Sequence, residues 1–114
     1  MQAAHAGRIE EAIGILTREA AQEHSGRARF QRRIQLAALC LTIGQEAVAC
    51  PILQELAEEI ERRKLYEWEA PDVVAHPLTL LFRCLHKLNG NAEERQRVYR
   101  QICRLDPVQA LALK

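Results

Sequence analysis

The fold class is decided by residues 30–44, which read FQRRIQLAALCLTIG. Their apolar side chains recur with the period of an α-helix and do not alternate as in a strand. They form two stripes, one of Phe30, Ile34, Ala37, Ala38 and Leu41, the other of Leu36, Leu39, Cys40 and Ile43. A helix that is apolar on most sides is a buried one, so we expect it at the centre of the core. Gly44 then supplies the left-handed position that ends a helix.

The segments on either side show the same helical period. Upstream, a helix is predicted to open at Gly7 and Arg8 and to stop near His24, with Ser25 capping the next helix. Downstream, a helix is predicted to restart at Gln45 and Glu46 and to run through Ile60. Pro51 interrupts that helix, and we expect either a kink or a later start.

The second half of the chain contains two further helical patterns. Trp68, Glu69, Ala70 and Pro71 predict a turn, after which Asp72 is positioned to cap a helix over residues 73–88 with a bend at Pro77. The next helix is predicted from about Ala92 to Leu105, and Asp106 and Pro107 stop it. The apolar tail at residues 108–113 is expected to add one turn, packed on the core or on a neighbouring subunit.

The predicted fold class is therefore all-α: a compact, tetratricopeptide-like bundle of about five helices in antiparallel pairs, without strands. A chain of 114 residues buries roughly two-thirds of its unfolded surface, enough for one domain over residues 1–114. A net charge of +1 argues against a nucleic-acid module. The sequence contains neither a membrane-length apolar run nor a signal peptide, so we expect a cytoplasmic protein without direct membrane insertion.

The residues that could carry chemistry predict neither an enzyme nor a metal or cofactor site. Cys40, Cys50, Cys84 and Cys103 lack the close spacing of metal ligands, and each falls in an apolar helical stretch where a thiol packs as a small hydrophobe. A nucleophilic pair such as Cys40 with His76 has no local signature. The chain also lacks a glycine-rich phosphate loop, and its one serine, Ser25, is not in a nucleophile elbow.

Several short stretches, taken in order, carry a family resemblance. They are residues 7–13 with Leu16, residues 25–30, residues 33–37 with Leu39 and Cys40, Gly44, residues 51–53 with Leu56, residues 60–65, Trp68 with Glu69, and Tyr99, residues 102–107, Ala110 and Leu111. In this order the chain resembles the C-terminal domain of the TssA family, the VasJ/ImpA-like proteins of type VI secretion. The family typically has Trp-Glu-Pro where Ala70 here precedes Pro71.

This resemblance implies a non-enzymatic assembly component of a contractile secretion machine. Domains of this family form rings, five- or six-fold and stacked, which dock on the tail during tube and sheath polymerisation. The implied partners are further copies of the chain and the tube, sheath, spike and baseplate proteins, with no nucleic acid and no cofactor. The chain would then be an oligomerisation domain taken from the C-terminal end of a longer protein.

The candidate contact residues are Arg29, Arg33, Leu65, Trp68, Glu69 and Leu111. For Trp68 two interpretations stay open, an interface contact or a core residue whose indole finds one hydrogen bond. Arg29 and Arg33 belong to a basic cluster at residues 27–33, which is either an ion-pairing interface or a solvated helix start. The alternative function is a monomeric tetratricopeptide-like adaptor that binds a partner peptide or helix in a concave groove.

Overall fold

The computed structural model of the chain describes residues 2–23 and 25–113, and for residues 2–7 and 9 it describes the backbone alone. Over these residues the chain forms six α-helices and one 3₁₀ turn, and no strand. The elements are α1 (Gln2–Gln22), α2 (Gly26–Thr42), α3 (Glu46–Arg63), η1 (Leu65–Glu67), α4 (Pro71–Lys87), α5 (Ala92–Leu105) and α6 (Pro107–Ala112). The predicted all-α class is confirmed, with one helix more than expected.

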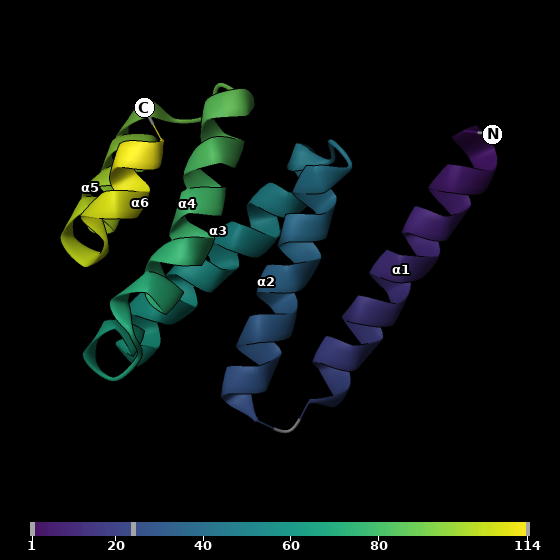
Figure 1. Ribbon diagram of the computed structural model, residues 1–114, viewed down its shortest axis with the longest axis horizontal. Helices are drawn as coiled ribbons and strands as arrows, with labels where there is room; N and C mark the ends of the chain where they lie inside the picture. The colour runs from purple at the N-terminus through teal and green to yellow at the C-terminus, as the bar shows by residue number, and fades with distance from the viewer. Residues whose placement is uncertain (1, 24, 114) are drawn as a thin grey trace.

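Each helix packs against the one that follows it, and successive helices run antiparallel (Figure 1). The result is a flattened stack measuring 43 × 34 × 22 Å, with α1 at one edge and α5 and α6 at the other. None of the helices in residues 2–23 and 25–113 has both the length and the apolar content that a membrane crossing needs.

The centre of the core lies on α4, which contacts α3, α5, α6, η1 and α2. Nine of its residues are buried: Val74, Ala75, Pro77, Leu78, Thr79, Leu80, Leu81, Cys84 and Leu85. The expectation that residues 30–43 form the central helix is therefore wrong. α2 lies between α1 and α3 and buries five residues, because only two helices cover it closely.

The ends of the first two helices agree in most respects with those predicted from the sequence. The hydroxyl of Ser25 accepts a hydrogen bond from the backbone N–H of Ala28 at 3.3 Å, so its capping role is confirmed. Gly44, after α2, has a φ of +78°, as predicted for a left-handed position. α1 begins at Gln2, ahead of the predicted start, because the alanines before Gly7 favour a helix. His24, its predicted stop, lies outside the described residues.

Two predictions that involve prolines are corrected by the structure. α3 begins at Glu46 and holds Pro51 in its interior, so a late start is wrong. Asp72 is not a cap: Ala70 is the N-cap residue of α4, with Pro71 in the first helical position. Proline suits that position because its fixed φ is helical and its missing N–H would have no partner there. Asp72 therefore lies one residue inside the helix, in its first turn.

The C-terminal elements follow the prediction closely. α5 spans Ala92–Leu105, and the side chain of Asn91 accepts from the N–H groups of Glu93 and Glu94 at 2.8 and 3.0 Å. Ala110 of α6 is buried, and Gln109 Nε2 donates to the carbonyl of Asp72 at 3.2 Å. Of the two positions predicted for the tail, the structure therefore shows packing on the chain's own core.

Candidate functional site

The connection between α3 and α4 forms a sharp corner, residues 64–71, which we call the Trp68 corner. It begins at Lys64, whose φ of +51° is left-handed, and continues as the 3₁₀ turn η1. Leu65 is buried and holds this turn on the core. Its side chain, one of the predicted contact residues, is therefore inside the subunit and is not available to a partner.

Trp68, by contrast, is 59% exposed, the most exposed aromatic side chain among the described residues. Its indole Nε1–H donates one hydrogen bond, to the carbonyl of Arg63 at 3.4 Å. The interpretation of Trp68 as a core residue is wrong, because most of the ring lies in solvent. The corner thus presents a large apolar side chain whose orientation is fixed by a bond at the end of α3.

An ion pair ties this corner to the start of α2. Arg27 Nε lies 2.9 Å from Glu69 Oε1, and the Glu69 side chain is only 9% exposed. A buried carboxylate needs such a partner, because its charge is costly away from water. Beside the pair lies a small hollow of about 260 Å³, lined by apolar side chains that include Phe30, Trp68 and Val73. Arg27 and Glu69 also line it.

The rest of the basic cluster is engaged within the chain. Arg33 makes a two-pronged contact with Glu55 of α3, at 2.9 and 3.2 Å, which lowers the pKa of that carboxyl. Arg32 lies 3.5 Å from Glu19 of α1, and Arg29 donates to the carbonyl of Glu23 at 3.1 Å. These arginines connect α2 to its two neighbouring helices, a role that neither sequence interpretation included.

The remaining predicted contact residue, Leu111, lies apart from the Trp68 corner. It is 72% exposed on α6, and Val108, one helical turn before it, is 75% exposed. Two apolar side chains three residues apart share one helix face. The structure thus brings Leu65, Trp68 and Glu69 together around one hollow, while Arg29, Arg33 and Leu111 are not among the residues that line it.

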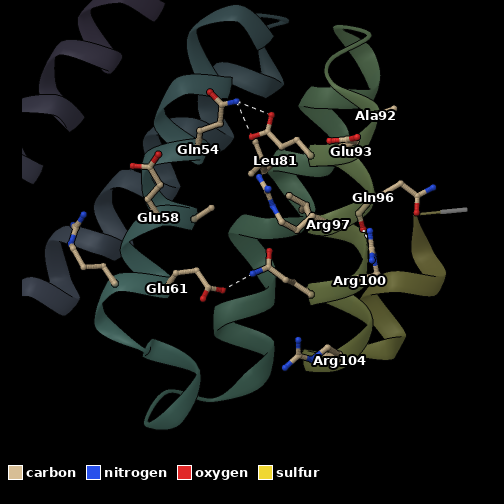
Figure 2. A pocket seen from close by; sticks show the side chains of 15 residues that line it. Gln54, Glu58, Glu61, Leu81, Ala92, Glu93, Gln96, Arg97, Arg100 and Arg104 are labelled. Atoms are coloured by element: carbon tan, nitrogen blue, oxygen red, sulfur yellow. Dashed lines mark hydrogen bonds between the residues drawn. The ribbon is translucent and has the colours of Figure 1, made fainter.

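One large concave surface was not predicted by the sequence analysis. It is a groove of about 1530 Å³ with α3 as one wall, α5 as the other and Leu81 of α4 between them (Figure 2). We call it the α3–α5 groove. Two residue pairs bridge it: Gln54 Nε2 donates to both carboxylate oxygens of Glu94, at 3.1 and 3.2 Å, and Gln101 Nε2 donates to Glu61 at 2.6 Å.

The only sequence signal for this groove is the run of arginines on α5. Arg97, Arg100 and Arg104 all line it, together with glutamates from both walls. The bonded partners are 40 positions apart in both cases, Gln54 with Glu94 and Glu61 with Gln101. No local pattern could have placed them on opposite sides of one cleft.

The thiols behave as packing groups. Cys40, Cys50 and Cys84 are buried, and Cys103 is partly buried. Burial raises the pKa of the Cys84 thiol to about 11, with smaller contributions from Cys50, Glu46 and Cys40. A neutral, enclosed thiol is a poor nucleophile. Cys40 is fully buried while His76 is exposed, so these two residues do not form the nucleophile pair considered above.

Among the described side chains, no three His, Cys, Asp or Glu residues come together as metal ligands would. The surface offers two kinds of contact to a partner. Exposed apolar side chains lie at the Trp68 corner and on α6, and a polar groove lies between α3 and α5.

Comparison with known protein families gives a match. Residues 1–81 match the model of a protein family described as type VI secretion, EvfE, EvfF, ImpA, BimE, VC_A0119, VasJ. The matched region includes the Trp68 corner and the α3 wall of the groove, and α5 and α6 lie outside it. No curated protein and no solved structure matches the chain.

Proposed function

The chain belongs to the type VI secretion family of ImpA and VasJ, and from this premise we propose that it is a non-enzymatic assembly component of the secretion machine. In this proposal the chain associates with copies of itself into a ring, and the ring docks on the tail tube and sheath or on the baseplate. The partners are then further copies of the chain together with tube, sheath, spike and baseplate proteins, inside the cytoplasm.

The observation that carries the proposal is the exposure of Trp68. Tryptophan is enriched at the centres of protein interfaces, where its large ring becomes fully desolvated. Here the ring is 59% exposed and lies within the region that matches the family. Tyr66, in the same corner, is 44% exposed, so the apolar surface is larger than one side chain.

A second apolar surface, Val108 and Leu111 on α6, supports a ring in particular. A contact between two different surfaces of identical subunits is heterologous, and repetition of such a contact closes into a ring when the rotation allows. The Trp68 corner and the α6 surface are two such different surfaces. The near-neutral net charge of +1 also favours a ring, since strongly charged copies would repel one another.

The two most apolar helical segments do not themselves argue for self-association. Apolar side chains surround most of residues 30–43 and 73–88, and apolar surface that a subunit leaves exposed would favour an interface. Most of that surface is in fact buried inside the subunit, because α3, α5 and α6 all pack on α4. The proposal therefore rests on the Trp68 corner and α6, and not on those two helices.

Sedimentation velocity at about 10 to 100 µM tests self-association. We expect a defined oligomer for the natural chain and a shift toward monomer for Trp68→Ala. Val48→Ala is the matched control, because Val48 is also an apolar side chain exposed by about half, on α3. A monomeric natural chain, or a Trp68→Ala variant with unchanged mass, would contradict the proposal.

The variant is expected to remain folded, since Trp68 makes a single exposed hydrogen bond. Circular dichroism checks this point. Binding of purified tube, sheath and baseplate proteins to the natural chain and to both variants then tests docking separately from self-association.

A second candidate function is the monomeric adaptor, and the α3–α5 groove favours it. This surface is concave, the shape that a docked helix or peptide needs, and it is lined mostly by polar side chains. A monomeric natural chain that binds a peptide in the groove would support the adaptor and contradict the ring.

A further inference from the structure

Three basic side chains of the α3–α5 groove differ from several others in this protein. Arg27, Arg32, Arg33, Arg63 and Lys87 each form an ion pair with a glutamate of the same chain. Arg97, Arg100 and Arg104 on α5 are exposed, line the α3–α5 groove, and form no ion pair with any described residue. The side chain of Arg100 donates only to the backbone carbonyl of Gln96, at 3.4 Å.

Among the described residues, no carboxylate of the groove forms an ion pair with these three arginines, and two of the carboxylates accept hydrogen bonds from amides. Glu61 accepts from Gln101, and Glu94 accepts from Gln54 through both oxygens. Each bond joins α3 to α5, so the bonds also fix the separation of the two walls. Figure 2 shows Arg97, Arg100 and Arg104 following one another along α5, with Arg97 extending toward the middle of the groove.

We propose that the α3–α5 groove binds a helical segment of a partner protein that carries carboxylates facing Arg97, Arg100 and Arg104. Arginine is suited to this task because its planar guanidinium can bind a carboxylate through two parallel hydrogen bonds. This inference names a ligand for the adaptor function proposed above, and it depends on that function. It requires no self-association, since the groove and the Trp68 corner are different surfaces.

The spacing of the three arginines favours a helix over an extended peptide. They occupy positions i, i+3 and i+7, so they lie on one face of α5 at steps of about 4.5 and 6 Å along its axis. A partner helix repeats the same steps with carboxylates at i, i+3 and i+7. In an extended strand, side chains on one face are about 7 Å apart, which does not match either step.

The other charges of the groove favour a protein over a nucleic acid. Glu58 and Glu61 on α3 and Glu93 and Glu94 on α5 line the same surface, and so does Arg62 on α3, so both walls carry charges of both signs. A continuous row of phosphates would meet carboxylates on both walls. A helix can place carboxylates on one face only and present neutral or basic side chains to Glu58.

Fluorescence anisotropy with a labelled helical peptide tests the proposal. The probe is an alanine-based peptide of about 20 residues with glutamates at i, i+3 and i+7 spacing. The comparison peptides carry lysines at those positions, or the same glutamates in consecutive positions. At about 50 mM salt we expect the spaced glutamate peptide to bind more tightly than either.

We call Arg97, Arg100 and Arg104 the arginine stripe. Charge reversal of this stripe, R97E/R100E/R104E, is expected to weaken binding of the glutamate peptide by about tenfold or more. The same variant should gain affinity for the lysine peptide. The matched control is R8E/R18E/R83E, which changes the net charge equally at exposed arginines outside the groove. That control should retain binding. Circular dichroism verifies the fold of both variants.

The proposal is overturned if no peptide binds, if the control loses affinity as much as the stripe variant, or if consecutive glutamates bind equally well. A single-stranded RNA of similar charge that binds more tightly than the peptide would overturn it in favour of nucleic acid. Sedimentation of the same variants separates this result from self-association, because reversal of the stripe should leave the oligomeric mass unchanged.

Discussion

The environment of Cys84 gives this side chain a defined effect on stability. The residue is fully buried on α4, and its Sγ lies 3.9 Å from the carbonyl of Glu46 on α3. Burial raises the pKa of the thiol to about 11, while a cysteine in an unfolded chain titrates near ~8.5. The folded state therefore holds this proton to higher pH than the unfolded state does.

It follows that the free energy of unfolding should fall as the pH rises from about 8.5 to 11. In that interval the unfolded chain has released the proton and the folded chain has retained it, so alkali favours unfolding. Urea unfolding at several pH values measures the slope. Cys84→Ala should be less stable at neutral pH by about 1 kcal/mol and should show a shallower decline.

All other ionisable groups are present in both proteins, so the difference in slope belongs to Cys84. Equal slopes for the natural chain and the variant would show that the thiol ionises equally easily in the folded protein. A fast reaction of Cys84 with a thiol reagent in the native state would lead to the same conclusion.

A residue's environment could be predicted when its partners lie close to it in the sequence. The four cysteines were expected to pack in the core because the apolar period around each is local, and three are buried. The partners of Arg33 and Arg27 could not be predicted, since Glu55 lies 22 positions away and Glu69 lies beyond the whole of α3. Trp68 was ambiguous because its exposure depends on how the corner packs against α2.

At the scale of the elements, the two prolines inside helices lie in different environments. Pro51 is exposed in α3, and Pro77 is fully buried in α4. Each removes one backbone hydrogen bond from its helix. Pro77 also fills space in the core, where truncation would leave a cavity.

We therefore expect different results from the same substitution. Pro51→Ala should raise the free energy of unfolding by about 1 to 2 kcal/mol, because it restores a bond and the gain exceeds the added freedom of the unfolded chain. Pro77→Ala should change it by less than about 1 kcal/mol, because the loss of packing offsets the restored bond. Chemical denaturation of both variants measures the difference, and equal effects would contradict the packing role of Pro77.

The elements themselves were largely predictable, because their signals are short. The bounds of α5 and the turn at Gly44 both depend on a few neighbouring residues. The start of α4 was misplaced by two residues, since Pro71 and Asp72 both carry a start signal and proline takes the first position. The α3–α5 groove was missed because it depends on α3 and α5 both packing on α4.

At the scale of the whole molecule, packing is uneven across the stack. α4 is covered by helices on several sides, while α1 lies at one edge and packs against α2 alone among the helices with extensive contacts. Residues held by few neighbours open at a lower free energy than residues in the core. The ion pair of Arg32 with Glu19 adds little at the α1–α2 contact, since both side chains are about 40% exposed.

Native-state hydrogen exchange should therefore detect different opening free energies in α1 and α4. We expect the amides of α4 to exchange only through global unfolding, and those of α1 to open at a free energy at least about 2 kcal/mol lower. A mild denaturant series measured by mass spectrometry distinguishes the two processes, because local opening responds little to denaturant while global unfolding responds strongly. Measurement at low protein concentration keeps self-association from protecting either helix. Protection of α1 equal to that of α4 would mean that the stack unfolds as one cooperative unit, with contacts at its edge as strong as those at its centre.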